Sequence, residues 1–436
     1  MRIKDILEID FFLLSAAIIL AIFGILFIYS SGITSTGVLV SKEYLRQIIW
    51  AGAGLLIAVL LSLIDYKRLR DISLYLYLAI LALLLYTCLF GRLVNGARAW
   101  IGIGTFGVQP SEFAKIITIL FLAKYLDDTK RTPAAFLRFI VSCGIVFIPM
   151  GLILIQPDFG TSLVFIPLLL VMTFVAGVAI RYIIFLGASI MLTGVLMVLP
   201  LWQTYILRRT FTLLLVLTNP RFIAVAISAL GLIAVIAVLG YSKYKKRYFF
   251  WILYVVGIII FSLGASYASH KVLKDYQIMR LIVFLDPNVD PRGAGWNIIQ
   301  SITAIGSGGF TGKGYLQGTQ SHYRFLPQQS TDFIFSIFTE ETGLLGGLFV
   351  FSLFLLICLR LVRIMRTTAD RFGEFICAGL SAMYIFHFLI NVGMTMGIMP
   401  ITGIPLLFMS YGGSAVISAM TGIGLALSIH VRRYSR

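Results

Sequence analysis

Residues 11–30 read FFLLSAAIILAIFGILFIYS and contain no ionisable side chain other than the phenol of Tyr29. A helix of about 20 mostly apolar residues spans a bilayer core about 30 Å thick. Similar runs recur along the 436 residues, of which 59% are hydrophobic and 12% charged, with a mean hydropathy of +0.98. Ordinary globular domains carry about 45–50% apolar and about 25% charged residues. The sequence therefore predicts an all-α polytopic membrane protein.

Length and apolar character predict about twelve transmembrane helices in a single integral membrane domain over residues 1–436. The predicted spans are 11–29, 47–64, 73–90, 111–126, 136–155, 161–177, 182–202, 221–240, 248–268, 333–359, 374–397 and 404–430. The apolar part of 203–219 is short and lies beside Arg208 and Arg209, so we interpret it as interfacial or re-entrant.

The Lys and Arg residues orient these spans. With both termini in the cytoplasm, the inner connections hold 21 of the 35 Lys and Arg residues, as the positive-inside rule favours. Much of the net charge of +17 then faces anionic lipid, and no nucleic-acid partner is needed to explain it. The four Cys residues lie in apolar stretches, and the four His residues show no HxxxH or HExxH spacing, so no metal site is predicted.

One connection is long enough to carry function: residues 269–332, which this orientation places outside the cell. It contains the Gly-rich segment Gly306–Gly314, which is not a nucleotide-binding P-loop because Gly314 stands where that motif needs Ser or Thr. Two readings remain for this segment. Its backbone amides and Lys313 could hold a phosphate, or the segment could be a flexible loop.

Two acidic residues lie near the outer ends of predicted spans in sequences that also suit a structural role. Glu112 and Lys115 are three residues apart on one helix, which fits either an ordinary ion pair or a functional site. Asp158 lies in the sequence QPDFGTS, where it could cap the sixth span or serve a site.

Three more carboxylates lie at the start of the tenth span. Asp332 either caps this helix, as Thr331 could instead, or is functional. Glu340 and Glu341 follow about 12–14 Å deeper at about 1.5 Å per residue, where carboxylates need a partner or water. Because Lys115 is the one cation expected in a span near that face, we expect a polar pocket between the fourth and tenth spans.

These motifs together resemble the SEDS family (shape, elongation, division and sporulation proteins), over roughly 1–202 and 270–436. Asp332 lies in the stretch TDFIF, and GTQS at Gly318–Ser321 resembles the RodA (elongation) branch more than the FtsW (division) branch. The other matching stretches are Asn95–Trp100 (NGARAW), Gln109–Glu112 (QPSE), Gln156–Thr161 (QPDFGT), Trp296–Ser301 (WNIIQS), Ala304–Gly309 (AIGSGG), Gly312–Gly314 (GKG), Phe325–Pro327 (FLP), Pro400–Pro405 (PITGIP) and Ser410–Ser414 (SYGGS).

The resemblance implies a peptidoglycan glycosyltransferase of the bacterial inner membrane that polymerises lipid II during cell-wall elongation. Asp332 matches the family's catalytic aspartate and would act as general base on the acceptor 4-hydroxyl, with undecaprenyl pyrophosphate leaving. The residues expected to bind substrate or pyrophosphate are Arg98, Glu112, Lys115, Asp158, Lys313, Gln320 and Ser321, and Arg292 is a further candidate cation. No cofactor is firmly implied, and a need for a divalent cation, Mg²⁺ or Mn²⁺, stays open.

The resemblance also implies partners: lipid II, a class B penicillin-binding protein with transpeptidase activity, and other membrane proteins of the elongation complex. One departure is visible, since RodA-like proteins typically have ten spans and residues 205–268 add a hydrophobic hairpin. Three alternatives remain. The chain could be a transporter or flippase of lipid-linked precursors, an FtsW-like division or sporulation member, or a non-catalytic scaffold for a transpeptidase.

Overall fold

The computed structural model describes residues 9–94, 96–103, 106–130, 135–207, 217, 219–272, 275–291 and 293–433. The chain divides into two compact units. Unit 1 comprises Met1–Val178 and Asn297–Arg436, and unit 2 comprises Ala179–Trp296. Unit 2 is therefore larger than the predicted insertion at 205–268, because it also includes the preceding helix and the first part of the long connection.

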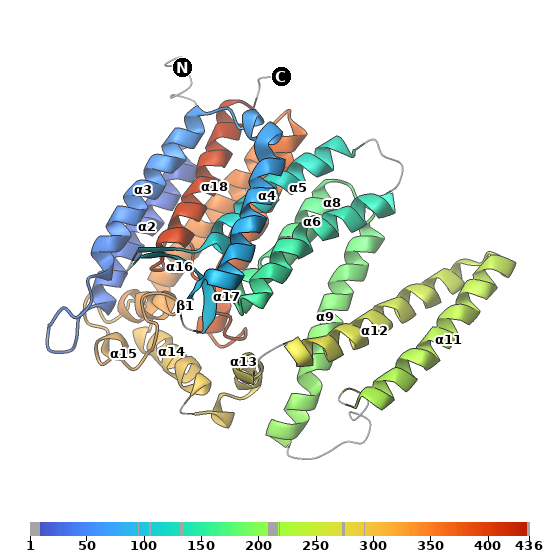
Figure 1. Cartoon of the computed structure of the whole chain (residues 1–436). Coiled ribbons are helices and arrows are strands. Elements are labelled where there is room, and N and C mark those ends of the chain that lie inside the picture. Colours follow the sequence, from blue (N-terminus) through green and yellow to red (C-terminus); the bar gives the residue numbers. More distant parts are fainter. Residues whose placement is uncertain are drawn as a thin grey trace. The chain divides into compact units, whose positions relative to one another are not determined.

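Unit 1 is a helical bundle in which α2 begins and α18 ends at the same end (Figure 1). The α3–α18, α16–α17, α4–α5, α2–α16 and α8–α17 pairs make its most extensive helix contacts. Its long helices are α2 (Phe11–Ser31), α3 (Glu43–Leu63), α4 (Lys67–Phe90), α5 (Pro110–Asp128), α6 (Ala135–Ile155), α16 (Ile334–Thr367), α17 (Arg371–Thr395) and α18 (Gly413–Val431), with the shorter α7 (Phe159–Leu163), α8 (Phe165–Val175), α14 (Ala294–Gly308) and α15 (Thr319–His322).

Local sequence explains where several helices begin. Asp10 caps α2 by accepting a hydrogen bond from the amide of Leu13, and Asp370 caps α17. Pro110 is the first residue of α5, where its missing N–H costs nothing. Two of these helices form the centre of unit 1, because most residues of α17 and α18 are buried.

Ten helices among the described residues are long and apolar enough to cross a membrane. The other two predicted spans are also helical. One is α5, which carries several ionisable residues, and the other is the short apolar run Phe159–Val175 formed by α7 and α8. The all-α polytopic fold is thus confirmed, while the count of twelve spans stays a prediction.

A small antiparallel sheet, which the sequence analysis did not predict, lies in the connection between α4 and α5. Its strands are β1 (Arg92–Val94), β2 (Ala97–Ile103) and β3 (Phe106–Val108), in the order β1-β2-β3. Leu93 pairs with Arg98 and Ile101 with Val108. Strand β2 contacts α4 and α5, and β3 leads directly into α5, the helix that carries Glu112.

Unit 2 contains α9 (Ile180–Trp202), the π-helical turn η1 (Gln203–Leu207), α11 (Pro220–Tyr244), α12 (Arg247–Val272), α13 (Asp275–Leu285) and the 3-10 turn η3 (Pro287–Val289). Helices α11 and α12 form an antiparallel hairpin, and α12 also packs on α9. The buried residues of α11 are Ile223 and Ala237, so most of its apolar surface is exposed. Most of the segment at 203–219 that was predicted to be interfacial or re-entrant, including Arg208 and Arg209, lies outside the described residues.

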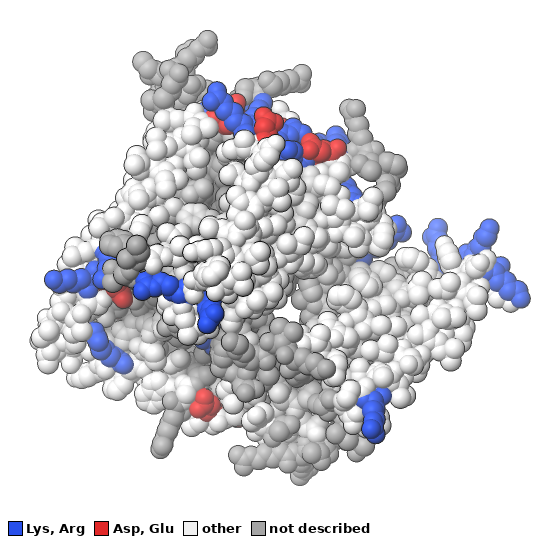
Figure 2. Space-filling model, in the orientation of Figure 1, with Lys and Arg blue, Asp and Glu red and all other residues white. Residues whose placement is uncertain are grey.

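Charged side chains on the face of unit 1 drawn in Figure 2 gather at the end where α2 begins and α18 ends. A band without charged residues separates them from those near the small sheet. At the turn of the unit 2 hairpin, Lys243, Lys245, Lys246 and Arg247 are all exposed. Bands of this kind are expected where an apolar surface faces lipid and charged ends face water.

Candidate active site

The Gly-rich segment is inserted into a break in helix α16. At Gly343 the backbone adopts φ 69° and ψ −164°, which is not helical. The amides of Leu344 and Leu345 donate to the carbonyls of Gly309 and Phe310, at 3.0 and 3.2 Å. In return, the amides of Lys313 and Gly314 donate to the carbonyls of Glu340 and Glu341, at 3.1 and 3.0 Å. Neighbouring backbone thus supplies partners for hydrogen-bonding groups that a broken membrane helix would leave unpaired.

Glycine is required at this crossing. A Cβ on Gly343 would lie 2.3 Å from the amide nitrogen of Gly312, and a Cβ on Gly312 would lie 2.1 Å from the carbonyl oxygen of Glu341. Both residues also have positive φ, which L-residues with side chains rarely adopt. Gly312 and Gly343 therefore serve close backbone approach, and the segment from Gly309 to Gly314 is held to α16 by backbone hydrogen bonds.

Glu340 caps the N-terminus of the short helix α15. Its Oε1 accepts hydrogen bonds from the amides of Thr319 and Gln320, at 2.8 and 3.0 Å, and its Oε2 accepts from the amide of Ser321 at 3.4 Å. The same Oε1 is 2.8 Å from Lys313 Nζ, which also donates to the Thr319 hydroxyl at 2.7 Å. The Glu340 side chain is fully buried, so a complete set of donors compensates its loss of hydration.

Glu341 connects the same loop to helix α2. Its carboxylate accepts hydrogen bonds from the Ser30 hydroxyl and, at 3.0 Å, from the amide of Leu316. Nε2 of His322 lies 3.8 Å from Glu341 Oε1. Burial lowers the pKa of His322, and the nearby charge of Glu340 opposes that shift.

These contacts differ from the expectation that Glu340, Glu341 and Lys115 share a polar pocket between the fourth and tenth spans. Glu340 and Glu341 are paired with the loop and with Ser30, and Lys115 contacts neither of them. Helix α17 packs against both α5 and α16. The amides of Lys313 and Gly314 are also bonded within the protein, so they do not form the phosphate cradle that the segment suggested.

Asp332 does not occupy the capping position of α16. The N-cap residue is Phe333, so neither Asp332 nor Thr331 stands at the predicted capping position, and the Thr331 hydroxyl donates to Gln328 instead. Asp332 is half-buried, and its carbonyl oxygen accepts a hydrogen bond from Asn391 Nδ2 at 3.0 Å.

Residues 330 and 331, just before Asp332, are fixed by the segment that follows α17. The amide of Tyr411 donates to the carbonyl of Ser330 at 2.7 Å, and the Ser410 hydroxyl donates to the carbonyl of Thr331. The Ser330 hydroxyl donates to Glu43 at 2.6 Å. The SYGGS motif therefore holds the backbone that carries Asp332.

Glu112 and Lys115 form the expected pair, with Lys115 Nζ 2.8 Å from Glu112 Oε2 and both side chains buried. The ammonium also lies 3.1 Å from Nε2 of His387 on α17. The ring Nδ1 lies 3.1 Å from the carbonyl oxygen of Pro405. The pair is thus part of a buried cluster that joins α5, α17 and the turn at 400–405.

Asp158 caps a helix, as one of its two predicted roles required. It caps α7 through Oδ1, which accepts from the amide of Thr161 at 3.1 Å, and its Oδ2 accepts from Gln109 Nε2 at 2.8 Å. Gln109 is the residue before α5, so Asp158 ties the start of α7 to the start of the helix that carries Glu112 and Lys115.

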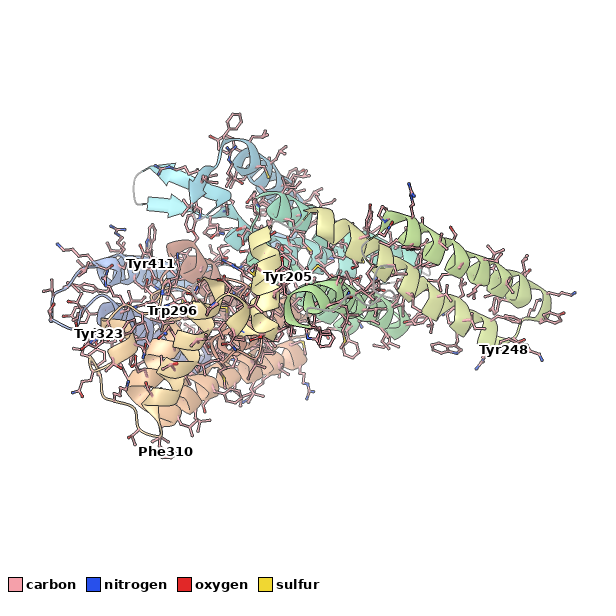
Figure 3. All side chains as sticks on the ribbon, turned by 90° about the horizontal axis from the view of Figure 1, so that it is seen from below. Tyr205, Tyr248, Trp296, Phe310, Tyr323 and Tyr411 are labelled. Carbon is pink, nitrogen blue, oxygen red and sulfur yellow. The ribbon has the colours of Figure 1, made fainter. Side chains whose placement is uncertain are left out.

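The other predicted site residues are more scattered. Arg98 is exposed on β2, Ser321 is buried in α15, and the buried Oε1 of Gln320 accepts no hydrogen bond from the described residues. Arg292 lies outside the described residues. Phe310 and Tyr323 lie at the edge of unit 1 in Figure 3 and are exposed. Across the described residues, no three His, Cys, Asp or Glu side chains gather as a metal site would require.

Sequence reasoning missed three residues of this region: Ser30, His387 and Asn391. Their partners are 311, 272 and 59 residues away, respectively. Each is one of a few polar residues in a mostly apolar helix, which is common in helix packing. One available signal was spacing, because His387 and Asn391 are four residues apart and share a face of α17.

The sequence matches the family described as the FtsW, RodA and SpoVE cell cycle proteins, over residues 11–226 and 212–435. Peptidoglycan glycosyltransferase RodA of Treponema pallidum is 48% identical over 99% of this chain and 100% of its own length. Peptidoglycan glycosyltransferase MrdB of Escherichia coli K12 is 32% identical over 89% of this chain and 85% of its own.

Solved structures show the same fold. A chain from a peptidoglycan synthase complex, described as coordinating polymerization and crosslinking, aligns with a TM-score of 0.67 and 26% identity, over 98% of this chain and 99% of that chain. RodA of Thermus thermophilus aligns with a TM-score of 0.60 and 23% identity over 98% of each chain. With its apolar helices, this chain is a multi-pass membrane protein. It belongs to the FtsW/RodA/SpoVE family.

Proposed function

We propose that this chain is a peptidoglycan glycosyltransferase that polymerises lipid II during cell-wall elongation. The observation that carries the proposal is its 48% identity, over the full length, to a protein named peptidoglycan glycosyltransferase RodA. The E. coli relative bears the same activity in its name. The arrangement around Asp332 supports the same chemistry, because a half-buried carboxylate on a fixed backbone suits a general base.

In the proposed reaction, Asp332 accepts the proton of the acceptor 4-hydroxyl as that oxygen attacks the anomeric carbon of the donor. The bond from this carbon to the pyrophosphate breaks, and undecaprenyl pyrophosphate leaves. One direct displacement inverts the donor α-linkage to a β-linkage. The protein's contribution is the position of the base and of cations near the leaving group.

The cations differ in how available they are to a pyrophosphate. Lys115 is buried beside Glu112 and His387, and Lys313 is bound to Glu340 with its side chain 26% exposed. Arg98 is exposed and can reach a ligand at the membrane surface. We propose that three cations balance the charge of the leaving group: Lys115, Lys313 and Arg98. We propose that four neighbouring polar residues help to bind the substrate and to hold these cations: Glu112, Asp158, Gln320 and Ser321.

We propose that the termini face the cytoplasm and that the connection 269–332 faces outward from the inner membrane. The exposed cations at Lys243–Arg247 support this orientation through the positive-inside rule. Single Cys residues placed in Gly306–Gly314 should react with an impermeant thiol reagent in intact cells. If the Cys residues react with the reagent only after the cells are permeabilised, the segment faces the cytoplasm and the proposed topology is wrong. The proposed site of polymerisation would then lie on the cytoplasmic side of the membrane.

A class B penicillin-binding protein with transpeptidase activity is the proposed partner, along with other membrane proteins of the elongation complex. The aligned synthase complex, which is described as coordinating polymerization and crosslinking, supports this. We further propose that 205–268 is an insertion within the family core. The two segments of the family match overlap at 212–226, inside that stretch.

A transporter of lipid-linked precursors and a non-catalytic scaffold are the competing functions. Purified protein given labelled lipid II in detergent separates them, because only an enzyme makes glycan strands without a second leaflet. We expect strands from the parent protein and none from the Asp332→Asn variant. A parent protein that makes no strands, in detergent and with its transpeptidase partner present, would overturn the proposal.

A further inference from the structure

Two buried side chains of α17 contact the two parts of the candidate site: His387 contacts Lys115, and Asn391 contacts the backbone of Asp332. His387 is 1% exposed, and its ring lies between Lys115 Nζ and the carbonyl oxygen of Pro405, at 3.1 Å from each. Asn391, four residues later and fully buried, donates through Nδ2 to the carbonyl oxygens of Asp332 and Ile404, at 3.0 and 2.8 Å. Both side chains therefore bind consecutive carbonyls of one turn.

The hydrogen-bonding roles of the His387 ring follow from its neighbours. A carbonyl oxygen can only accept, so Nδ1 carries the hydrogen that bonds Pro405. The ammonium of Lys115 can only donate, so Nε2 offers its lone pair. The ring is therefore neutral and fully engaged, and a proton on Nε2 would set two positive groups against each other.

The Asn391 amide is oriented by the same logic. Both of its contacts are carbonyl oxygens, and only the NH₂ group can donate to them. Its Oδ1 is buried and accepts no hydrogen bond from the described residues. The amide keeps this orientation because turning it over would leave two carbonyls facing an oxygen.

These contacts form a chain of hydrogen bonds from Glu112 to Asp332. It runs through Lys115 and His387 to Pro405, passes one peptide bond to Ile404, and reaches Asp332 through Asn391. Lys115 belongs to α5 and Asp332 precedes α16, so 217 residues of sequence separate them. Helix α17 provides the shared support that relates their positions.

We propose that His387 and Asn391 are positioning residues of the polymerisation reaction, which set the place of Lys115 relative to Asp332. This role rests on the proposed function. Neither residue touches the reacting atoms. Each acts through the group it holds, and misplacing a reacting group by about 1 Å can cost about 100-fold in rate.

Three His387 variants of the full-length protein separate this role from simple packing. His387→Gln keeps one acceptor and one donor at similar reach, His387→Asn is too short to span both partners, and His387→Leu has neither. We expect His387→Leu and His387→Asn to lose about 10- to 100-fold in kcat on lipid II. We expect His387→Gln to stay within about fivefold of the parent, with KM for lipid II changed less than kcat in all three.

Tyr384→Phe is the matched control. Tyr384 is a buried residue of the same helix, and its hydroxyl donates to the carbonyl of Ala419 at 2.7 Å without contacting Lys115 or Asp332. Losing this bond should lower the melting temperature much as His387→Leu does, with kcat kept within about threefold. Asn391→Leu should behave like His387→Leu, which supplies a second test if one variant fails to fold.

Each outcome decides between the roles. His387→Leu or Asn391→Leu with kcat within threefold of the parent would overturn the proposal, and so would an equal loss in Tyr384→Phe. A His387→Gln variant as impaired as His387→Leu would also overturn it, because the hydrogen bonds would not be what matters. If the parent protein is active and the Asp332→Asn variant is inactive, the proposed polymerase activity is supported independently of the His387 and Asn391 variants. If the parent protein itself makes no glycan strands, it is the proposed function that fails, and the positioning role fails with it.

Discussion

Glu340 accepts hydrogen bonds from Lys313 Nζ and from three successive amides of α15, although its side chain has no exposed surface. The carboxylate lies immediately before the break in α16, and the loop it binds fills that break. A buried carboxylate pair, which at first suggests a substrate channel, instead anchors the loop that contains Lys313 and Leu316. This finding weakens the transporter reading, because these two groups are already paired within the protein.

Glu340→Gln should loosen this loop. The amide offers one acceptor in place of two, and its NH₂ group would face donors. Hydrogen bonds to charged groups contribute about 1.5–3 kcal/mol each, and Lys313 recovers part of the loss because it can turn toward water. We expect a clear drop in melting temperature together with reduced polymerisation.

Glu43→Gln is its control, since Glu43 is half-buried and accepts from the Ser330 hydroxyl. It should lose much less stability. Equal losses in the two variants would contradict the anchoring role of Glu340.

Asp332→Asn should abolish polymerisation while the protein folds and inserts normally. Asparagine keeps the shape of the side chain and can still accept a hydrogen bond, so we expect a stability change of no more than about 1 kcal/mol. Losing a positioned general base costs about 10²–10⁴ in rate. The measurement is strand synthesis by the purified variant, and a rate within a few-fold of the parent would exclude Asp332 as the base.

Lys115→Ala should strongly reduce polymerisation and should also destabilise the protein. It leaves the buried carboxylate of Glu112 without its cation, and breaking a buried pair in this way costs about 3–5 kcal/mol. The double variant Glu112→Gln with Lys115→Met removes both charges and should recover stability but not activity. Recovery of activity in that variant would show that the pair is only structural.

Deleting the hairpin at about 205–268 should leave polymerisation intact. No acidic residue lies between Trp202 and Asp275, so the hairpin supplies no catalytic carboxylate. The deletion variant is compared with the parent for strand synthesis and for accessibility of the Gly306–Gly314 segment. A variant whose loop stays ordered but which makes no strands would assign the hairpin a direct role.

His322 predicts a pH dependence of stability. Its pKa in the folded protein lies below the ordinary 6.5, so the unfolded chain binds a proton more readily. The contribution of His322 to the free energy of unfolding is therefore complete above about pH 6.5. It is lost as the pH falls toward the lowered pKa of the folded protein. The melting temperature of the parent should fall more between pH 7 and 5 than that of His322→Gln, and identical slopes would contradict the shift.

The sequence by itself determined most of the architecture, because apolar run length, capping and charge asymmetry are local properties. The predicted spans 11–29 and 136–155, for example, coincide with α2 (Phe11–Ser31) and α6 (Ala135–Ile155). The ion pair of Glu112 with Lys115 also follows from spacing along one helix. The sequence analysis missed the small sheet because two of its three strands, β1 and β3, have only three residues each, which leaves almost no alternating pattern.

Only the tertiary structure decided what holds the site together. The partners of Glu340 and Glu341 come from a loop that enters a helix break and from Ser30 on α2, and no pattern of spacing links such segments. The same is true of His387 and Asn391, which are ordinary polar residues of an apolar helix until α5 and the 404–405 turn pack against them. Hydrogen bonds between distant segments form only when the packing of the helices is complete, and for that reason they cannot be predicted from a single sequence.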